Sequence, residues 1–366
     1  MTADALTAKI RRLIALNGPM PVSDYMAICL LDPDHGYYTR SEPFGKDGDF
    51  ITAPEISQLF GEIIGAWLIN TWRRLGRPTP FVLAEAGPGR GTLMKDILRA
   101  GTIDPAFADA AQPTLIEASP KLRAVQAATL ADAAGRTVWL DSLDQLPDLP
   151  LIMVTNEFFD ALPFRQFILH EGKWVERCVG LNEEGVLQWQ LGTAQLSTDQ
   201  IPANITQAAQ EGAIYEISPS RENTMAVIAK HIAQHGGAAI NFDYGHTETA
   251  IGDTFQAVKK HTFADPLDTP GNADLTSHVD FDALSRSART EGAFTFPIMT
   301  QGEFLLQCGL LERAGQLGAN KPSALQVQIR ADVQRLAGNE PEDMGDLFKV
   351  FCIAQSDQVA LAPFSQ

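Results

Sequence analysis

Short apolar runs alternate along the chain with segments of helical periodicity. These runs are FVLAE (81–85), PTLIEAS (113–119), TVWLDS (137–142), LIMVTNEF (151–158) and AAINFDYG (238–245). After the first of them, a helical pattern with one apolar face covers residues 93–99 and ends at Gly101. Strands that alternate with crossover helices form parallel sheets, and nearly unbroken apolar strands indicate a sheet covered on both faces. The pattern predicts an α/β, doubly wound, Rossmann-like sheet.

Three regions depart from this alternation. The first 75 residues are mainly helical in pattern, and we predict that residues 1–75 form a helical cap ahead of a domain spanning residues 76–366. Alternating patterns split by Asn-Glu-Glu-Gly predict an antiparallel β-hairpin inserted at about 164–217. Residues 246–291 are rich in Asp, Thr, Pro and Gly, which predicts a second insertion of loop that is followed by a helix near Phe281–Arg289.

The segment FVLAEAGPGRGTL (81–93) places Gly87, Gly89 and Gly91 directly after the first strand. A P-loop would need Gly-Lys-Ser/Thr, and a dinucleotide loop has the spacing GxGxxG instead of GxGxG. Glu85 lies two residues before the first glycine, where its charge would repel a pyrophosphate but suits an ammonium group. The loop therefore predicts a site for S-adenosyl-L-methionine, which carries an ammonium and a sulfonium and no phosphate.

Four further residues are candidates for binding this cofactor. Glu117 ends the second strand, where a carboxylate binds the ribose hydroxyls of adenosyl ligands, NAD included; the alternative is a helix-capping or solvated Glu. Asp141 and Ser142 end the third strand, where we expect either a contact with the adenine amino group or a plain turn. Thr52 lies in GDFITAPEISQLFGE (48–62), which has more polar groups than a helix cap requires and predicts a segment folding over the cofactor.

The loop after the fourth strand, NEFFDALP, contains the candidate catalytic residues Asn156, Glu157 and Asp160. Methyltransferases acting on neutral amides or adenine carry Asn/Asp-Pro-Pro-aromatic there, whereas this chain has Glu157 in place of the first proline. An arginine guanidinium stays protonated and is a poor nucleophile, and carboxylates orient it through paired hydrogen bonds. We predict that Glu157 and Asp160 hold a guanidinium; the alternative is that Glu157 caps a turn and Asp160 is solvated.

Several of these stretches resemble the MidA-like family of S-adenosylmethionine-dependent methyltransferases, the complex I assembly proteins of mitochondria and proteobacteria. They are DPDHGYYTR (32–40), GDFITAPEISQLFGE (48–62), AEAGPGRGTLMKDILR (84–99), NEFFDALPFRQF (156–167), NFDYGH (241–246) and LTSHVDFDAL (275–284). The resemblance implies a class I methyltransferase fold and, from the mitochondrial members, symmetric dimethylation of an arginine on a respiratory complex I subunit. The expected antiparallel pairing of FTFP (294–297) with LFKVFCIA (347–354) also fits a methyltransferase sheet better than a dehydrogenase sheet.

Composition limits the partners. The net charge of -17 argues against nucleic acid or an anionic membrane and favours a partner with basic segments. Four separated cysteines and seven histidines form no ligand pairs, so we expect no metal site and predict reduced thiols in a cytoplasmic protein. No run reaches the roughly 18 apolar residues of a membrane span, and no secretory signal is recognised. Three alternatives stay open: an assembly chaperone that keeps the fold, a methyltransferase with another acceptor, and a Rossmann oxidoreductase.

Overall fold

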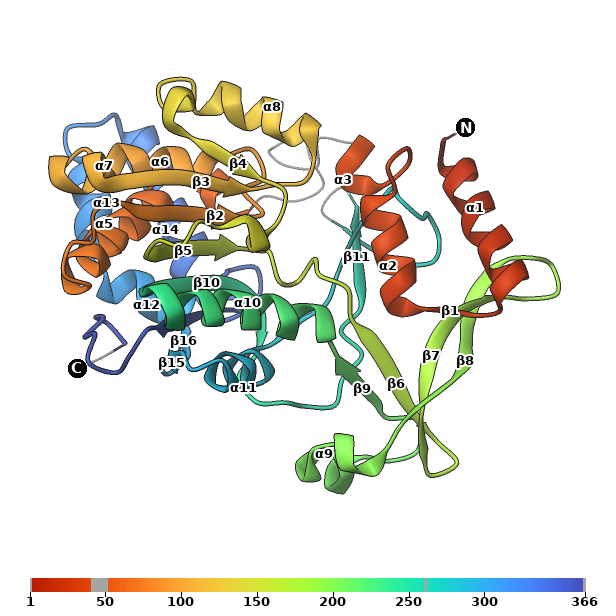
Figure 1. The fold of residues 1–366 in the computed structure, drawn as a ribbon. Coiled ribbons are helices and arrows are strands. Elements are labelled where there is room, and N and C mark those ends of the chain that lie inside the picture. Colours follow the sequence, from red (N-terminus) through yellow and green to blue (C-terminus); the bar gives the residue numbers. More distant parts are fainter. Residues whose placement is uncertain (1, 41–51, 260–261, 365–366) are drawn as a thin grey trace. The chain divides into compact units, whose positions relative to one another are not determined.

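The computed structural model describes residues 2–40, 52–259 and 262–364, and the chain forms two compact units (Figure 1). Unit 1 contains Met1–Phe50, Phe159–Asn223 and Glu248–Asp280, and unit 2 contains Ile51–Phe158, Thr224–Thr247 and Phe281–Gln366. This division differs from the predicted boundary at residue 75. Helix α5 (Gln58–Arg74) belongs to unit 2 because its apolar face joins the core around the main sheet. A capping role for the N-terminal segment stays a prediction.

The main sheet of unit 2 has the strand order β15–β17–β10–β5–β2–β3–β4. Its strands are β2 (Phe81–Ala86), β3 (Ala111–Ile116), β4 (Val138–Leu140), β5 (Leu151–Asn156), β10 (Gly237–His246), β15 (Phe294–Thr295) and β17 (Phe348–Ala354), with β16 (Met299–Thr300) also paired to β17. Pairing from β4 through β10 is parallel, and β17 runs antiparallel to β10. The doubly wound α/β fold predicted from the apolar runs is confirmed, as is the antiparallel final strand.

Helices complete unit 2 around this sheet. They are α4 (Ala53–Ile56), α5, α6 (Thr92–Gly101), α7 (Pro105–Ala110), α8 (Pro120–Thr129), most of α10 (Pro219–His235), α11 (Phe281–Thr290), α12 (Gln301–Gln307), α13 (Leu310–Gly318) and α14 (Ser323–Ala337). Strands β2 and β5 are buried along their whole length. Both faces of these parallel strands are covered, so neither face needs polar side chains toward water. This burial explains their continuous apolar sequence.

Helices α5 and α6 pack closely through two glycines of α5. A Cβ on Gly61 would lie 2.5 Å from the Cβ of Asp96, and one on Gly65 would lie 2.7 Å from the Cβ of Ala100. Both distances are too short for real carbon atoms, so only glycine permits this approach. The packing brings α6, which begins at the glycine loop, directly onto α5.

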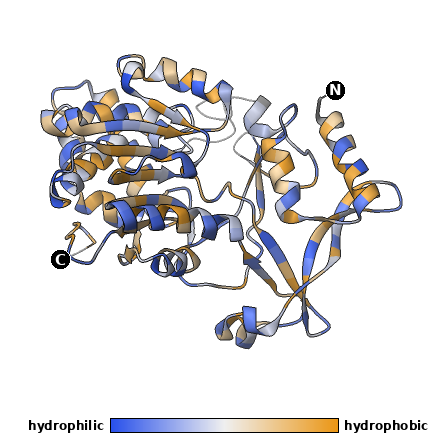
Figure 2. Ribbon diagram, viewed as in Figure 1, coloured by the Kyte–Doolittle hydropathy of each residue, from blue (hydrophilic) through white to orange (hydrophobic). Residues whose placement is uncertain are grey.

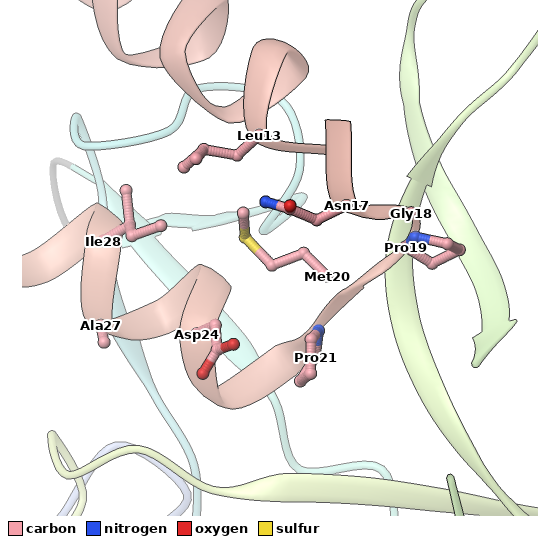
Figure 3. Close-up of a pocket in the computed structure, with 9 residues that line it drawn as sticks. All are labelled: Leu13, Asn17, Gly18, Pro19, Met20, Pro21, Asp24, Ala27 and Ile28. Carbon is pink, nitrogen blue, oxygen red and sulfur yellow. The ribbon is translucent and has the colours of Figure 1, made fainter. Parts of the chain in front are cut away.

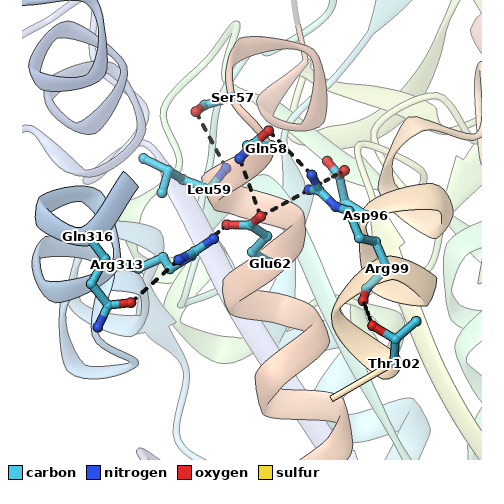
Figure 4. Close-up of polar contacts among 9 residues, drawn as sticks. All are labelled: Ser57, Gln58, Leu59, Glu62, Asp96, Arg99, Thr102, Arg313 and Gln316. Atoms are coloured by element: carbon cyan, nitrogen blue, oxygen red, sulfur yellow. Dashed lines mark hydrogen bonds and ion pairs between the residues drawn. The ribbon is translucent and has the colours of Figure 1, made fainter. Parts of the chain in front are cut away.

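Glu62 of α5 joins three helices through its carboxylate (Figure 4). Its oxygens pair with Arg99 of α6 at 3.1 Å and with Arg313 of α13 at 2.8 Å. Arg99 also pairs with Asp96 at 2.7 Å. Burial raises the pKa of Asp96 to about 6; the nearby Arg99 opposes the shift and Glu62 adds to it. These ion pairs connect the side chains of α6 to α5 and, through Glu62, to α13.

Unit 1 contains the N-terminal helices and two antiparallel sheets. Its helices are α1 (Thr2–Asn17), α2 (Val22–Leu31), α3 (Tyr37–Arg40) and α9 (Ala203–Ala208), and its first sheet has the order β1–β7–β6–β9, with β8 also paired to β7. The bounds of these strands are β1 (Met20–Pro21), β6 (Arg165–His170), β7 (Lys173–Leu181), β8 (Leu187–Leu196) and β9 (Ile214–Ile217). Polar and apolar residues are mixed along α1 (Figure 2).

The first predicted insertion and residues 248–280 of the second belong to unit 1, and the two insertions differ in how far the sequence described them. Strands β6, β7 and β8 form successive antiparallel pairs, which confirms the predicted hairpin. The second insertion contains a small sheet of β11 (Gln256–Lys259), β12 (Thr262–Ala264) and β13 (Asp274–Thr276), which its loop-like composition did not indicate. Among the described helices, none combines the length and apolar character that a bilayer span requires.

Candidate cofactor and active site

Glu85 and the glycine loop lie at the carboxyl end of β2, next to β5. Gly87, Gly89 and Gly91 have φ values of 65°, 51° and 81°, in the left-handed region that favours glycine. Gly91 is the N-cap of α6, so the loop leads directly into that helix. The Glu85 side chain is 3% exposed, and its Oε2 has no hydrogen-bond partner among the described residues.

The three glycines meet different neighbours. A Cβ on Gly87 would lie 2.8 Å from Cδ2 of Phe158, so the ring of Phe158 occupies the space beside this glycine. A Cβ on Gly91 would make ordinary contact, at 3.5 Å, with the side chain of Gln126. The three glycines predicted that another group comes close to the loop backbone. At Gly87 that group is the side chain of Phe158, which belongs to unit 2.

Gln126 of α8 connects the glycine loop to Glu117. Its Nε2 donates to the carbonyl of Gly89 at 2.9 Å and to Oε2 of Glu117 at 3.1 Å, while its Oε1 accepts from the Trp139 indole at 3.0 Å. Sequence analysis missed this residue. The sequence pattern could have identified Gln126, because it lies four residues after Leu122 and so places an amide side chain on the same buried face of α8.

Glu117 lies just beyond β3, where the ribose ligand was predicted. Its Oε1 accepts from the backbone N–H of Ser119 at 2.8 Å, and Ser119 caps α8 through its hydroxyl. Burial raises the pKa of Glu117, and the hydrogen bonds from Ser119 and Gln126 oppose that shift. The carboxylate is therefore held in place by the protein and keeps acceptor capacity, since each oxygen has two lone pairs. Its role toward the ribose stays a prediction.

Asp141 and Ser142 follow β4, as predicted, but Asp141 has a partner that the sequence did not suggest. Arg123 of α8 pairs with Oδ1 of Asp141 at 2.6 Å and also donates through Nε to the carbonyl of Glu117, at 2.6 Å. Arg123 thus joins the ends of β3 and β4. Ser142 is the N-cap of a short 3-10 turn (Leu143–Gln145) without a capping hydrogen bond from its side chain.

Thr52 is the N-cap of α4, and its side chain makes no capping hydrogen bond. Within α4, Glu55 accepts a hydrogen bond from the hydroxyl of Thr92, the first residue of α6. The polar segment before α5 therefore contacts the helix that begins at the glycine loop. Residues 48–51 of the same stretch lie outside the described residues.

Asn156 is the last residue of β5, and Glu157 follows it. Nδ2 of Asn156 donates to Oε1 of Glu157 at 3.0 Å, and Oδ1 of Asn156 is buried with no hydrogen-bond partner among the described residues. Glu157 has φ 48°, which is uncommon for a residue other than glycine. Its N–H donates to the carbonyl of Phe242 at 2.9 Å.

Asp243 of β10 holds the same loop from the neighbouring strand. Its Oδ2 accepts from the N–H of Phe158 at 3.2 Å, its Oδ1 accepts from the N–H of Tyr244 at 3.0 Å, and the side chain is fully buried. Asp243 was not predicted as a site residue from the sequence. A carboxylate inside the otherwise apolar run AAINFDYG was the signal that could have identified it.

Asp160 belongs to unit 1, whereas Asn156 and Glu157 belong to unit 2. It is buried, so the solvated alternative does not apply. Its carbonyl accepts from Nη2 of Arg221 at 2.9 Å and from the N–H of Ser277 at 3.3 Å. The same guanidinium donates to the carbonyl of His278 at 2.7 Å, so Arg221 fixes the backbone of two segments of unit 1.

The residues at the end of β2 and β5 fit S-adenosylmethionine. Glu85 Oε2 and Asn156 Oδ1, which have no hydrogen-bond partner within the described part of the chain, suit a ligand that donates hydrogen bonds and carries positive charge. The left-handed glycines leave the loop backbone without side chains at three positions, and the carboxylate of Glu117, at the end of the neighbouring strand, is held by the N–H of Ser119. No group of three or more potential metal ligands occurs within the described part of the chain.

A cavity of about 450 Å³ lies in unit 1 beside the turn that joins α1 to α2 (Figure 3). Leu13, Met20 and Ile28 give it an apolar wall, and Asn17 and Asp24 supply polar atoms. Its lining includes none of the residues predicted for the site, so the cavity adds nothing to the arrangement around the glycine loop.

Comparisons with known proteins identify the family to which the chain is similar. Residues 63–299 match the family described as "Putative S-adenosyl-L-methionine-dependent methyltransferase". A mitochondrial protein arginine methyltransferase NDUFAF7 homolog from Drosophila melanogaster is 36% identical, with 94% of this chain and 84% of the relative covered. The human protein arginine methyltransferase NDUFAF7, mitochondrial, is 35% identical, with 95% and 83% covered.

A solved structure from Burkholderia thailandensis, bound to S-adenosyl-homocysteine, is also similar. It superposes with a TM-score of 0.86 at 27% identity and covers all of this chain and 96% of its own. The methyltransferase family match leaves the oxidoreductase alternative without support.

The predicted cytoplasmic location is wrong by the same comparisons. The relatives from Drosophila melanogaster, Danio rerio and Homo sapiens are all named as mitochondrial. Separated cysteines indicate a reducing environment, and that property does not distinguish one reducing compartment from another.

The family match over most of the chain, the relatives above 30% identity and the sheet order lead to one assignment. The chain belongs to the family of S-adenosyl-L-methionine-dependent methyltransferases that includes the mitochondrial protein arginine methyltransferase NDUFAF7.

Proposed function

We propose that this methyltransferase acts on an arginine side chain of a protein, and that this protein is a subunit of respiratory complex I. The names of the relatives support arginine, and the resemblance to complex I assembly proteins supports the partner. The observation that carries the proposal is the position of Glu157. Glu157 follows β5, at the point where the strand order of the sheet reverses direction. Its carboxylate accepts a hydrogen bond from Asn156. Enzymes that act on neutral amides have a proline at this position.

Glu157 would orient the guanidinium and balance its charge. When bound, S-adenosylmethionine supplies a methyl group that its sulfonium already activates. The chain must therefore present one guanidinium nitrogen in the correct direction and exclude water, which are positioning tasks. Methylation replaces a proton on that nitrogen while the guanidinium keeps its charge, so one proton must leave. A carboxylate oxygen of Glu157 is the group we assign to accept it.

The test is transfer of labelled methyl groups to proteins of a lysate that lacks this enzyme. We expect label on arginine of a complex I subunit with the parent protein. Glu157→Gln keeps the side-chain volume and removes the charge, so transfer should fall more than about tenfold while affinity for S-adenosylhomocysteine stays within about twofold. Glu312→Gln, on the exposed surface of α13, is the matched control and should transfer normally.

Other outcomes would overturn parts of this proposal. Label on lysine, glutamine or nucleic acid would reject arginine as the acceptor, and label on arginine of an unrelated protein would reject complex I. Absence of transfer with normal cofactor binding would favour the assembly-chaperone alternative. Asp160→Asn is tested separately: normal turnover in that variant would remove Asp160 from the proposed catalytic residues.

A further inference from the structure

Asp243 is a fully buried carboxylate on β10, a central strand of the main sheet. From Ala238 to Tyr244 the buried residues of this strand are otherwise apolar, with the exception of Asn241. Removing a carboxylate from water is unfavourable, and a protein retains one in its core only where hydrogen bonds or charges compensate. Packing of the sheet therefore does not explain an aspartate at this position, and its hydrogen bonds show what it holds.

Asp243 bonds to the loop after β5 where the main-chain pairing of β10 with β5 ends. The N–H of Glu157 still donates to the main-chain carbonyl of Phe242, at 2.9 Å. The next N–H along the chain, that of Phe158, donates to Oδ2 of Asp243 at 3.2 Å. The side chain of Asp243 thus continues the attachment of the loop to β10 beyond the last main-chain bond.

Both oxygens of this carboxylate accept from backbone N–H groups. Oδ1 accepts from Tyr244 on the same strand at 3.0 Å, while Oδ2 accepts from Phe158. A rotation of the Asp243 carboxylate would break at least one of these bonds. An asparagine of the same shape has a single acceptor oxygen and a donor in place of the second, so it satisfies only one of the two N–H groups. The arrangement therefore requires a carboxylate.

The peptide that Asp243 holds lies between two parts of the site. Glu157 has φ 48°, a left-handed conformation that a residue with a side chain keeps only when surrounding contacts maintain it. The Glu157 carboxylate accepts from Nδ2 of Asn156 at 3.0 Å. The ring of Phe158, the next residue, occupies the space beside Gly87 of the glycine loop. A change in this peptide would therefore redirect the Glu157 side chain.

We propose that Asp243 is a positioning residue for methyl transfer. Its carboxylate holds the peptide between Glu157 and Phe158 in the left-handed turn, and this turn sets the direction in which Glu157 presents its charge to the acceptor. Asp243 acts through Glu157, so its effect on the reaction requires the Glu157 carboxylate. In this respect the inference rests on the proposed function.

Asp243→Asn keeps the size of the side chain and removes one of its two acceptors. Labelled methyl transfer to the lysate that lacks this enzyme, at saturating S-adenosylmethionine, should fall about tenfold or more. The Kd of S-adenosylhomocysteine should stay within about threefold, because a misdirected Glu157 affects the transition state and not the cofactor. Hydrogen exchange of the amides in residues 156–160 should become faster. Asp243→Ser also keeps one acceptor and is the second variant, with the same expected losses.

The matched control is Asp104→Asn. Asp104 also accepts a backbone N–H, from Phe107 at the start of α7, and it belongs to the same unit. Asparagine caps a helix as well as aspartate does, so this variant should transfer methyl groups as the parent does.

A double-mutant cycle with Glu157→Gln separates positioning from general support of the fold. Once the charge of Glu157 is absent, Asp243→Asn should reduce transfer by less than about a further twofold, because both changes then affect one interaction. A residue that only supports the fold would cause the same loss in both backgrounds, and that result would overturn the inference.

The single variants distinguish failure of this inference from failure of the proposed function. Normal transfer by Asp243→Asn and Asp243→Ser, with transfer by Glu157→Gln impaired, would overturn the inference and leave the proposed function intact. Normal transfer by Glu157→Gln would instead reject the proposed role of Glu157, and the positioning role of Asp243 would be rejected with it.

Discussion

At the end of β2, Glu85 is buried, and no cationic side chain among the described residues pairs with its carboxyl group. Burial raises the pKa of Glu85 from 4.5 to about 8, and the hydrogen bond from the Met94 backbone N–H opposes the shift only in part. Without ligand, the carboxyl is therefore largely protonated at neutral pH. A bound ammonium favours the ionised form, so the binding of the cofactor and the loss of this proton are linked.

This linkage predicts a pH dependence of cofactor binding. Between about pH 6 and about pH 7.5, affinity for S-adenosylhomocysteine should rise with pH, by at most about tenfold per unit, with release of a proton on binding. Calorimetry in buffers of different ionisation enthalpy measures both quantities. Glu85→Gln cannot titrate and should bind with a flat profile. A parent protein whose affinity falls or stays constant over this range would contradict the prediction.

The Glu85 carboxyl group also makes the free energy of unfolding depend on pH, and this contribution falls as pH rises. The folded, ligand-free protein holds the Glu85 proton up to about pH 8, whereas the unfolded chain releases it near 4.5. The stabilisation from this proton is complete below pH 4.5 and disappears as pH rises through about 8. The contribution of Glu85 to the free energy of unfolding should therefore decrease across that interval, and Glu85→Gln should lack this component in urea titrations.

Glu157 carries backbone strain at a position where its charge is proposed to act. Glycine adopts its φ of 48° freely, so Glu157→Gly should raise the free energy of unfolding by about 1 kcal/mol while methyl transfer falls more than about tenfold. Glu171 is the matched control, since it has φ 51° in the turn between β6 and β7. Glu171→Gly should gain similar stability and keep its activity. Normal activity of Glu157→Gly would remove the proposed role of this carboxylate.

At the scale of elements, the contact between α5 and α6 depends on glycine for space. Gly61→Ala would place a Cβ 2.5 Å from that of Asp96, so overpacking should lower the free energy of unfolding by about 1–3 kcal/mol. Gly315 of α13 has no atom within 4 Å of an added Cβ, and Gly315→Ala should raise stability by about 0.5–1 kcal/mol through helix propensity. Chemical denaturation of both variants tests the pair, and stabilisation of Gly61→Ala would contradict the packing.

The elements themselves differ in how well the sequence predicted them. β2 and β5 followed from continuous apolar runs, because burial on both faces requires them. The sheet β11–β13 did not, because its short strands lie in a stretch of turn-forming residues. Helix α5 was assigned to an N-terminal cap because it precedes the first strand, although its apolar face completes the core of unit 2.

For the whole molecule, the net charge of -17 predicts how substrate binding responds to salt. A basic acceptor peptide is attracted by the acidic protein, and this attraction is screened as ionic strength rises. The KM for an arginine-containing basic peptide should increase several-fold between about 50 mM and about 300 mM salt, while the Kd of S-adenosylhomocysteine changes less than about twofold. Steady-state kinetics at fixed cofactor saturation measures this effect, and a constant KM would contradict it.

The sequence by itself determined the alternating elements, the parallel sheet, the glycine loop and the acidic residues at the strand ends. These features follow from burial, backbone conformation and strand polarity, which act over a few neighbouring residues. Only the tertiary structure decided which groups meet across the chain. Gln126 contacts Gly89 from 37 positions away, and Asp243 holds Phe158 from 85 positions away. The oxygens of Glu85 and Asn156 that lack hydrogen-bond partners among the described residues likewise became evident only with their surroundings, because whether a buried polar atom is satisfied depends on every group packed around it.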